Sequence, residues 1–172
     1  MKSLALLTTV ALCLVVNATD TLAAQTAVVE LRNSSGDGIG TAILTAAPVG
    51  VKIVVGVHGL PPGRHGFHIH NVGRCEPPAF ASAGGHFNPL GKQHGFMNPQ
   101  GMHAGDQPNL IVAADGTARV EVYAMHVTLG DGPNSLYHSG GTALVVHASA
   151  DDEATDPAGN AGARIACGVV TR

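Results

Sequence analysis

Most of the residues that could bind a metal ion lie between Gly66 and Asp106. Five of the ten histidines fall in this segment, and the spacings between them are unequal. Glycines, prolines and asparagines separate them, which favours a site built from strand ends and loops over a site on one helix face. The candidate ligands are His68, His70, His86, His94, His103 and Asp106, with His147 as a sixth histidine far downstream.

The side-chain types point to two different metal sites. Imidazole suits copper and zinc, and an added carboxylate oxygen suits zinc in a closed four-ligand site. His68 and His70 are two residues apart, so a strand would place both on one face and Phe67 and Ile69 on the other. A deprotonated imidazole can bind a metal through each ring nitrogen. The donors therefore predict a site of nitrogens alone beside a site with three nitrogens and one oxygen.

The rest of the chain has the pattern of an all-β fold. Tryptophan is absent, aromatic content is 3%, and short β-branched runs alternate with Gly, Pro and Asp. Such runs predict a β-sandwich or β-barrel of about eight strands, with no helix longer than one turn. The expected strands are residues 26–32, 39–45, 51–58, 64–70, 109–113, 117–125, 143–147 and 164–170, with residues 85–88 as a further short candidate.

Two long loops, at residues 71–106 and 148–163, interrupt these strands. A loop of this length is unusual in a compact domain unless it is functional or held by cross-links. The metal ligands and Cys75 supply both reasons in the first loop. Between the strands 109–113 and 117–125, the Asp115-Gly116 pair predicts a β-hairpin. No repeat or linker appears, which indicates one domain.

The N-terminus has the pattern of a secretory signal peptide. One lysine precedes an apolar run from Leu4 to Val16, which is too short to span a bilayer, and small residues follow. Cleavage after Ala18 or after Ala24 fits this pattern, so residues 1–24 are predicted as the leader and residues 25–172 as the mature domain. A buried N-terminal helix is the alternative, but no capping or amphipathic pattern supports it. No other segment is apolar enough to span a membrane.

Two cysteines remain once the leader is removed, Cys75 and Cys167. In an exported protein such a pair predicts one disulfide, worth on the order of 4–5 kcal/mol for so long a loop. Two free thiols are the alternative. The formal net charge of −3 provides no basic face for nucleic acid. We therefore expect a periplasmic or secreted protein with no nucleic-acid partner and, after leader removal, no membrane partner.

The order of these motifs resembles that of the copper–zinc superoxide dismutases of the bacterial exported type. That family forms an eight-stranded antiparallel Greek-key β-barrel with two long functional loops, in agreement with the strand pattern. The N-terminal strands match in pattern only. The matching segments, which span nearly the whole mature chain, are Gly66–His70, Ser82–Pro89, His94-Gly95, His103–Asp106, Leu144–His147 with Asp151-Asp152, and Gly159–Val169.

The resemblance implies a role for each candidate ligand and for two further residues. Asp151, with Asp152 as its adjacent competitor, would accept the outer N–H groups of His68 and His94 and so orient one copper ligand and one zinc ligand. Arg164 would stand over the copper and attract an anionic substrate. The implied copper ligands are His68, His70, His86 and His147, and the implied zinc ligands are His86, His94, His103 and Asp106.

The implied activity is that of a superoxide dismutase. Two superoxide anions and two protons become dioxygen and hydrogen peroxide at a copper centre that His86 bridges to a structural zinc. Zinc has no redox chemistry, so copper alone changes oxidation state, and His86 would deliver a proton to the second superoxide. Arg164 and His86 are therefore the implied catalytic residues. The histidines outside the ligand positions are His58, His65, His126 and His138.

The chain departs from the animal cytosolic relatives in the parts that guide the substrate. The loop before Arg164 is shorter, contains no lysine, and has Ala158 where those relatives usually carry a threonine. Arg64, Arg74 or Lys92 could take over the guidance, and the sequence does not rank them. The loop around the first cysteine also differs, which leaves open whether the chain forms a homodimer.

Two other interpretations compete with the enzyme. A non-catalytic exported domain of the same fold that binds or buffers copper would typically lack a copper ligand or the arginine, whereas this chain keeps all of them. A structural or adhesive β-sandwich would leave the histidine pattern without a cause. The sequence therefore favours the dismutase.

Overall fold

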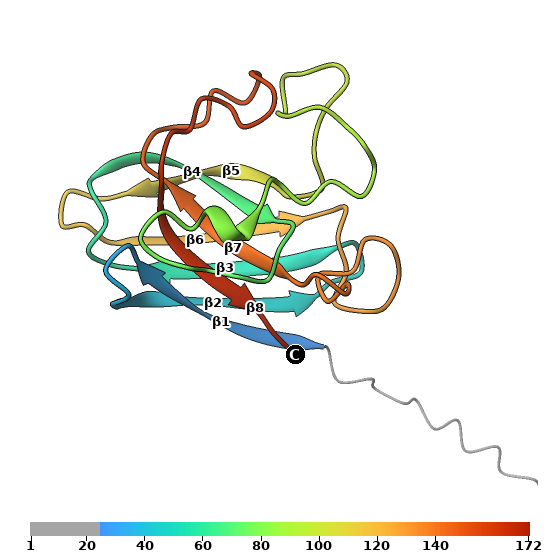
Figure 1. Ribbon diagram of the computed structural model, residues 1–172, viewed down its shortest axis with the longest axis horizontal. Coiled ribbons are helices and arrows are strands. Elements are labelled where there is room, and N and C mark those ends of the chain that lie inside the picture. Colours follow the sequence, from blue (N-terminus) through green and yellow to red (C-terminus); the bar gives the residue numbers. More distant parts are fainter. Residues whose placement is uncertain (1–24) are drawn as a thin grey trace, which may run out of the picture.

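The computed structural model describes residues 25–172, so the predicted signal peptide lies outside the described residues. These residues form one eight-stranded antiparallel sheet that curls into a nearly closed barrel, which confirms the all-β prediction (Figure 1). No helix in this part of the chain is long and apolar enough to cross a membrane. The elements are β1 (Thr26–Asn33), β2 (Gly38–Ala46), β3 (Val51–Val57), β4 (Gly63–His70), the 3₁₀ turn η1 (Ala81–Ala83), β5 (Asp106–Val112), β6 (Ala118–Ala124), β7 (Thr142–His147) and β8 (Arg164–Val170).

Period-two alternation builds the barrel core from most strands. In β3, for example, Val51, Ile53, Val55 and Val57 are buried, and the residues between them are partly exposed. Successive side chains of a strand point to opposite faces, so this pattern sends one face inward and leaves the other toward solvent. Burial of these apolar side chains is the main favourable term in folding the barrel.

β4 and β7 differ because they are buried on both faces. All six residues of β7 are buried, and β4 is buried from His65 to its end. Phe67 and Ile69 of β4 belong to the barrel core. His68 and His70 point to the outer face and are nonetheless almost completely buried. A strand can therefore serve the core and a polar site at once, provided that something covers its outer face.

The two long loops provide that cover, and they lie side by side above β4 and β7 (Figure 1). The His94 backbone N–H donates to a carboxylate oxygen of Asp156 at 2.7 Å, and the Met97 N–H donates to the Glu153 carbonyl oxygen at 2.9 Å. Gly95 has a φ of 101°, and a Cβ there would collide with the Glu153 carbonyl group. Glycine is required here because the backbones of the two loops approach so closely.

Two predictions about the residues near the ligands were wrong. No strand forms at residues 85–88, where a single bridge joins His86 to His70. β5 begins earlier than expected, because Asp106 pairs with His68 across the ladder between β4 and β5. Asp106 is therefore a strand residue and not part of the preceding loop.

The hairpin predicted at Asp115-Gly116 forms its turn but not its ladder. The Ala113 N–H donates to the Thr117 carbonyl oxygen at 2.8 Å, as a tight turn requires. β5 then pairs with β4, and β6 pairs with β3, in the strand order β5-β4-β7-β8-β1-β2-β3-β6. β5 and β6 are thus the two ends of the sheet, and they contact each other at a seam without ladder hydrogen bonds. Pro108, which has no N–H to donate, lies in β5 at this edge.

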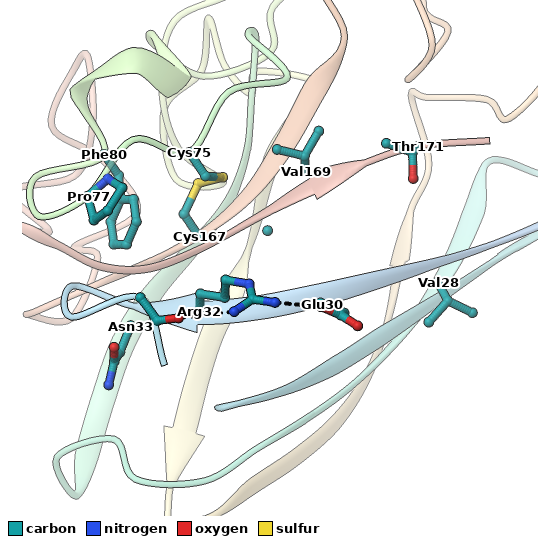
Figure 2. Close-up of a pocket in the computed structure, with 12 residues that line it drawn as sticks. Val28, Glu30, Arg32, Asn33, Cys75, Pro77, Phe80, Cys167, Val169 and Thr171 are labelled. Atoms are coloured by element: carbon teal, nitrogen blue, oxygen red, sulfur yellow. Dashed lines mark hydrogen bonds and ion pairs between the residues drawn. A yellow bond between two sulfur atoms is a disulfide. The ribbon is translucent and has the colours of Figure 1, made fainter. Parts of the chain in front are cut away.

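The disulfide predicted between Cys75 and Cys167 is confirmed, and it joins the first long loop to β8. Figure 2 shows the bond close to β1, where the Arg32 guanidinium pairs with Glu30 at 3.0 Å. A cleft of about 510 Å³ lies between these groups. The two cysteines are 92 residues apart, so the cross-link removes much of the freedom of the unfolded chain, on the order of 4–5 kcal/mol. It also fixes the segment that leads into η1.

Candidate metal centre

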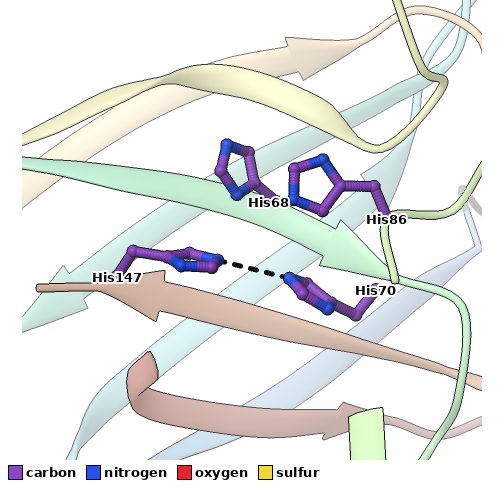
Figure 3. Close-up of side chains that lie close together, drawn as sticks. All are labelled: His68, His70, His86 and His147. Atoms are coloured by element: carbon purple, nitrogen blue, oxygen red, sulfur yellow. Dashed lines mark hydrogen bonds between the residues drawn. The ribbon is translucent and has the colours of Figure 1, made fainter. Parts of the chain in front are cut away.

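Four imidazoles meet on the outer face of β4 and β7 (Figure 3). His68 and His70 come from β4, His147 ends β7, and His86 comes from the first long loop. Each offers one ring nitrogen, and the four nitrogens lie within 4.8 Å of one another. We call these residues the four-imidazole cluster.

Hydrogen bonds fix the orientation of three of these rings. The outer nitrogen of His70, Nδ1, lies 2.9 Å from the Gly84 carbonyl oxygen, and Nδ1 of His147 lies 3.1 Å from the Gly162 carbonyl oxygen. Nε2 of His68 lies 2.7 Å from Asp151. Carbonyl and carboxylate oxygens only accept, so each outer nitrogen carries the proton. The opposite nitrogen of each ring is therefore unprotonated and points into the cluster, where it can bind a metal. The dashed 3.4 Å contact in Figure 3 between Nε2 of His70 and Nε2 of His147 thus joins two acceptors.

Burial keeps the imidazoles of this cluster neutral. Loss of hydration lowers the pKa of His68 to about 3, that of His70 to about 2 and that of His147 to about 4. Burial also lowers the pKa of His86. Neutral imidazole is the form that binds metal, so at neutral pH the cluster needs to lose few protons before it can coordinate an ion.

A second cluster surrounds the carboxylate of Asp106. Its Oδ1 lies 2.8 Å from Nδ1 of His86, 3.1 Å from Nδ1 of His94 and 3.2 Å from Nδ1 of His103. Its Oδ2 accepts hydrogen bonds from the backbone N–H groups of Gly95 and His103. Burial alone would raise the pKa of Asp106, but the hydrogen bonds from the imidazoles and from Gly95 outweigh it and hold the pKa well below its usual range. Three nitrogens and one oxygen thus converge, and His86 belongs to both clusters.

Asp151 connects the two clusters from behind. One carboxylate oxygen lies 2.7 Å from Nε2 of His68, and the other lies 3.0 Å from Nε2 of His94. Asn109 in β5 holds the Asp151 backbone through both of its amide atoms, at 2.8 and 2.9 Å. The neighbouring Asp152 instead accepts hydrogen bonds from within its own loop. Of the two adjacent carboxylates, Asp151 is therefore the one that contacts the histidines.

The second long loop passes directly over this carboxylate. Gly159 has a φ of 61°, and a Cβ there would overlap the Asp151 carboxylate and crowd the His94 ring. Glycine is therefore needed both for the backbone angle and for the space. Burial by itself would lower the pKa of His94, but its hydrogen bonds to Asp106 and Asp151 outweigh this effect and raise the pKa to about 9.

Arg164 stands at the open side of the four-imidazole cluster. Its guanidinium donates to the Phe80 carbonyl oxygen at 2.7 Å and to the Gly84 carbonyl oxygen at 2.5 Å. Burial lowers the pKa of Arg164, but no acidic side chain pairs with it among the described residues. With His70 and His147 it lines a cavity of about 330 Å³. The cavity thus combines unprotonated imidazole nitrogens with one fixed positive charge.

The fold and these clusters define a class: an antiparallel β-barrel with two adjacent groups of side chains on its outer face that could each hold a metal ion. The family model for copper/zinc superoxide dismutase (SODC) matches residues 39–170. The chain belongs to the copper/zinc superoxide dismutase family, whose members are oxidoreductases.

Similar proteins of known sequence include bacterial ones. The chain is 54% identical to copper–zinc superoxide dismutase 2 of Aquifex aeolicus over 143 residues. This match covers 82% of this chain and 84% of the relative. It is 45% identical to the superoxide dismutase-like protein YojM of Bacillus subtilis, over 83% of this chain and 74% of the relative.

Solved structures agree with the fold. A SOD-like protein from Bacillus subtilis superimposes with a TM-score of 0.81 at 42% identity, over 84% of this chain and 97% of that chain. A double mutant of that protein, in which a tyrosine and a proline are each replaced by histidine, gives 0.82. The Cu/Zn superoxide dismutase from Brucella abortus gives 0.71 at 31% identity, over 86% of this chain and 100% of that chain.

The donors present here fit the copper and zinc that the family implies. Two buried ring nitrogens, Nδ1 of His68 and Nε2 of His86, have no hydrogen-bond partner. A buried polar atom without a partner costs about 1–3 kcal/mol, and a bound metal ion would remove that cost. An all-nitrogen set suits copper, and three nitrogens with one carboxylate oxygen suit zinc.

The structure brings together every candidate ligand that the sequence singled out, and it adds groups that the sequence did not. Asn109 was assigned only to a strand, although it positions the Asp151 backbone. The carbonyl oxygens of Phe80, Gly84 and Gly162 orient side chains of the centre. Backbone acceptors leave no mark in side-chain types, so no sequence signal identifies them.

The low pKa values of the four-imidazole cluster make a prediction for the metal-free protein. Below pH 6.5 the unfolded chain protonates His68, His70 and His147, whereas the native chain does not until about pH 4 or lower. Stability is therefore lost as the pH falls through this window. We expect the free energy of unfolding, from urea denaturation, to fall by at least about 2 kcal/mol between pH 7 and pH 5.

Substitutions of histidine by glutamine test the source of this loss. His147→Gln should make the dependence on pH shallower, whereas His58→Gln, at an exposed histidine outside the centre, should leave it unchanged. Equal stability of the metal-free protein at pH 7 and pH 5 would show that the cluster does not stay neutral.

Proposed function

We propose that this chain is an exported superoxide dismutase that converts two superoxide anions and two protons into dioxygen and hydrogen peroxide. The observation that carries the proposal is the pair of unpartnered inner nitrogens, His68 Nδ1 and His86 Nε2, in a cluster that opens beside Arg164. The proposed copper ligands are His68, His70, His86 and His147. The proposed zinc ligands are His86, His94, His103 and Asp106.

Copper, when bound, supplies the one-electron chemistry, and zinc supplies none and would organise its ligands. The protein's contribution centres on His86, whose two nitrogens face different clusters. Nδ1 lies 2.8 Å from Asp106, and Nε2 faces the four-imidazole cluster without a hydrogen-bond partner. Nε2 is thus the atom that can hold a proton close to the substrate. His86 lines the cavity at Arg164, so a proton held there is within reach of a small anion.

Arg164 binds and orients the anion. Its two hydrogen bonds to carbonyl oxygens hold the guanidinium in place, so little reorganisation is needed when superoxide enters. Asn88 and Ala158 also line the cavity, and neither carries a charge. A small anion is therefore attracted by one preorganised charge in a confined space.

Two observations support export. The Cys75–Cys167 disulfide forms and persists in oxidising compartments, and similar bacterial proteins are copper–zinc superoxide dismutases. We infer a leader at residues 1–24, cleaved after Ala18 or Ala24, and a periplasmic or secreted mature protein.

A non-catalytic domain of the same fold that binds or buffers copper is the second candidate. It is favoured by the likeness to a protein named only superoxide dismutase-like. The presence of all seven candidate ligands and of Arg164 in this chain argues against it.

Metal analysis of the purified mature protein, together with an assay of superoxide decay, distinguishes the two candidates. The dismutase should contain close to one copper and one zinc per chain and should remove superoxide far faster than free dismutation. A protein that holds both metals but does not outpace free dismutation would be the copper-binding domain.

Replacing Arg164 tests the role of the fixed charge. Arg164→Ala should lower the rate by roughly tenfold or more and make it less sensitive to salt, because attraction of the anion is electrostatic. Both metals should stay bound, since Arg164 is not a ligand. Arg164→Lys, which keeps the charge but not the paired hydrogen bonds, should retain part of the rate. Loss of metal from the alanine variant would mean that Arg164 is structural.

Ion pairing ranks the cations that could guide superoxide from a distance. The Arg64 guanidinium lies 4.0 Å from the Glu153 carboxylate, and the Arg74 guanidinium lies 3.7 Å from the Glu76 carboxylate. A nearby negative charge therefore offsets each of these two positive charges. Lys92 has no acidic partner among the described residues. The Asn88 side chain, which lines the cavity at Arg164, bonds to both the N–H and the carbonyl oxygen of Lys92, at 2.9 and 2.8 Å.

We therefore expect Lys92 to guide the substrate. Lys92→Gln should lower kcat/KM roughly twofold at low ionic strength, as expected for one unit charge about 10 Å from an anion in water. The loss should vanish at high salt. Arg119→Gln is the matched control, because Arg119 is exposed, lacks an acidic partner in the described chain and lies on β6 outside the cavity. Equal effects of the two substitutions would indicate a response to net charge alone.

A further inference from the structure

The seam between β5 and β6 holds a cleft separate from the cavity at Arg164, although one proposed zinc ligand, Asp106, contributes to its wall. Its volume is about 420 Å³, and none of its lining residues lines the cavity at Arg164. The first long loop, both end strands of the sheet and the residues after β6 contribute to its walls. Among the lining residues are Phe96, Met102, Pro108, Tyr123, Met125 and His126.

Three of these side chains are donors for a soft metal ion. Met102 and Met125 each carry a thioether sulfur, and His126 carries an imidazole. Thioether donors favour Cu(I), whereas calcium and magnesium require oxygen ligands. The carboxylate of Glu121 also lines the cleft, but it already pairs with Lys52 at 3.8 Å and accepts a hydrogen bond from Tyr123. Asp106 and Gln107 line the cleft too, but the Asp106 carboxylate is already held by three imidazoles of the second cluster. The two thioethers and the imidazole are thus the soft donors of the cleft.

Packing does not account for the positions of these methionines. Methionine usually fills gaps in apolar cores, yet Met125 is 60% exposed and Met102 is only half-buried. Neither belongs to the barrel core. Met97, on the same loop as Met102, is 68% exposed and does not line the cleft. Two of the three methionines between residues 25 and 172 thus line the same surface cleft as a histidine.

We propose that Met102, Met125 and His126 form a third metal site, which binds one Cu(I) ion. Each methionine side chain has three rotatable bonds, so the two sulfurs can close on an ion within a cleft of this size. The site differs in chemistry from the four-imidazole cluster, which contains no sulfur. It would give the protein a place to hold reduced copper at its surface, and it does not depend on the dismutase activity.

Anaerobic titration with Cu(I) tests the site in the protein that already holds copper and zinc, with its copper kept reduced. In competition with a chromogenic Cu(I) chelator, the protein should retain one further equivalent of Cu(I). Met102→Leu and Met125→Leu should each weaken this binding at least tenfold, and leucine is close enough in volume to preserve the fold. The ¹³C-methyl NMR signals of Met102 and Met125 should shift on binding.

Met97 provides the internal control. Met97→Leu should leave the affinity unchanged, and the Met97 methyl signal should stay in place. Superoxide decay measured on the same variants keeps the test separate from the proposed function, because none of the three methionines lines the cavity at Arg164. Failure to retain the further equivalent, or retention unaffected by the Met102 and Met125 substitutions, would overturn the proposal.

Discussion

The carboxylate of Asp151 is the constraint on which the arrangement of the centre depends. It contacts His68 of one cluster and His94 of the other, and so fixes which nitrogen of each ring faces inward. An imidazole can ligate through either nitrogen, and a hydrogen bond to the outer one removes that freedom. Because Asp151 belongs to the second long loop and His94 to the first, the same contacts also hold the two loops together.

Burial on both faces of β4 and β7 explains how a polar centre can sit on a barrel of this size. The inner faces complete the apolar core, and the outer faces lie under the loops that bring in the remaining ligands. Covering the imidazoles removes water, which lowers the pKa values of His68, His70 and His147 and leaves these groups neutral. The loops therefore set the protonation of the centre as well as its geometry.

The sequence predicts the parts of this molecule that depend on side-chain type and period. Short β-branched runs between turn residues located all eight strands, and the spacing of His68 and His70 placed both on one face. Pairing between strands was less predictable: Asp106 was assigned to a loop although it is held in β5 by the ladder with β4. The turn at Asp115-Gly116 was correctly located, but a local turn signal does not encode that its strands pair elsewhere. Backbone acceptors such as the Gly84 carbonyl oxygen could not be predicted either, because every residue has a carbonyl group and its partner depends on the fold.

The Gly84 carbonyl oxygen accepts two hydrogen bonds, one from Nδ1 of His70 at 2.9 Å and one from the guanidinium of Arg164 at 2.5 Å. One backbone atom thus fixes the position of a candidate metal ligand and of the positive charge that would attract the substrate. The atom lies on the segment that the Cys75–Cys167 bond fastens to β8, the strand that begins with Arg164. The oxidation state of the surroundings is thereby coupled to the alignment of the centre: a chain folded in a reducing cytosol would hold the same ligands with a looser mutual position. Formation of the disulfide would therefore complete the alignment of the centre.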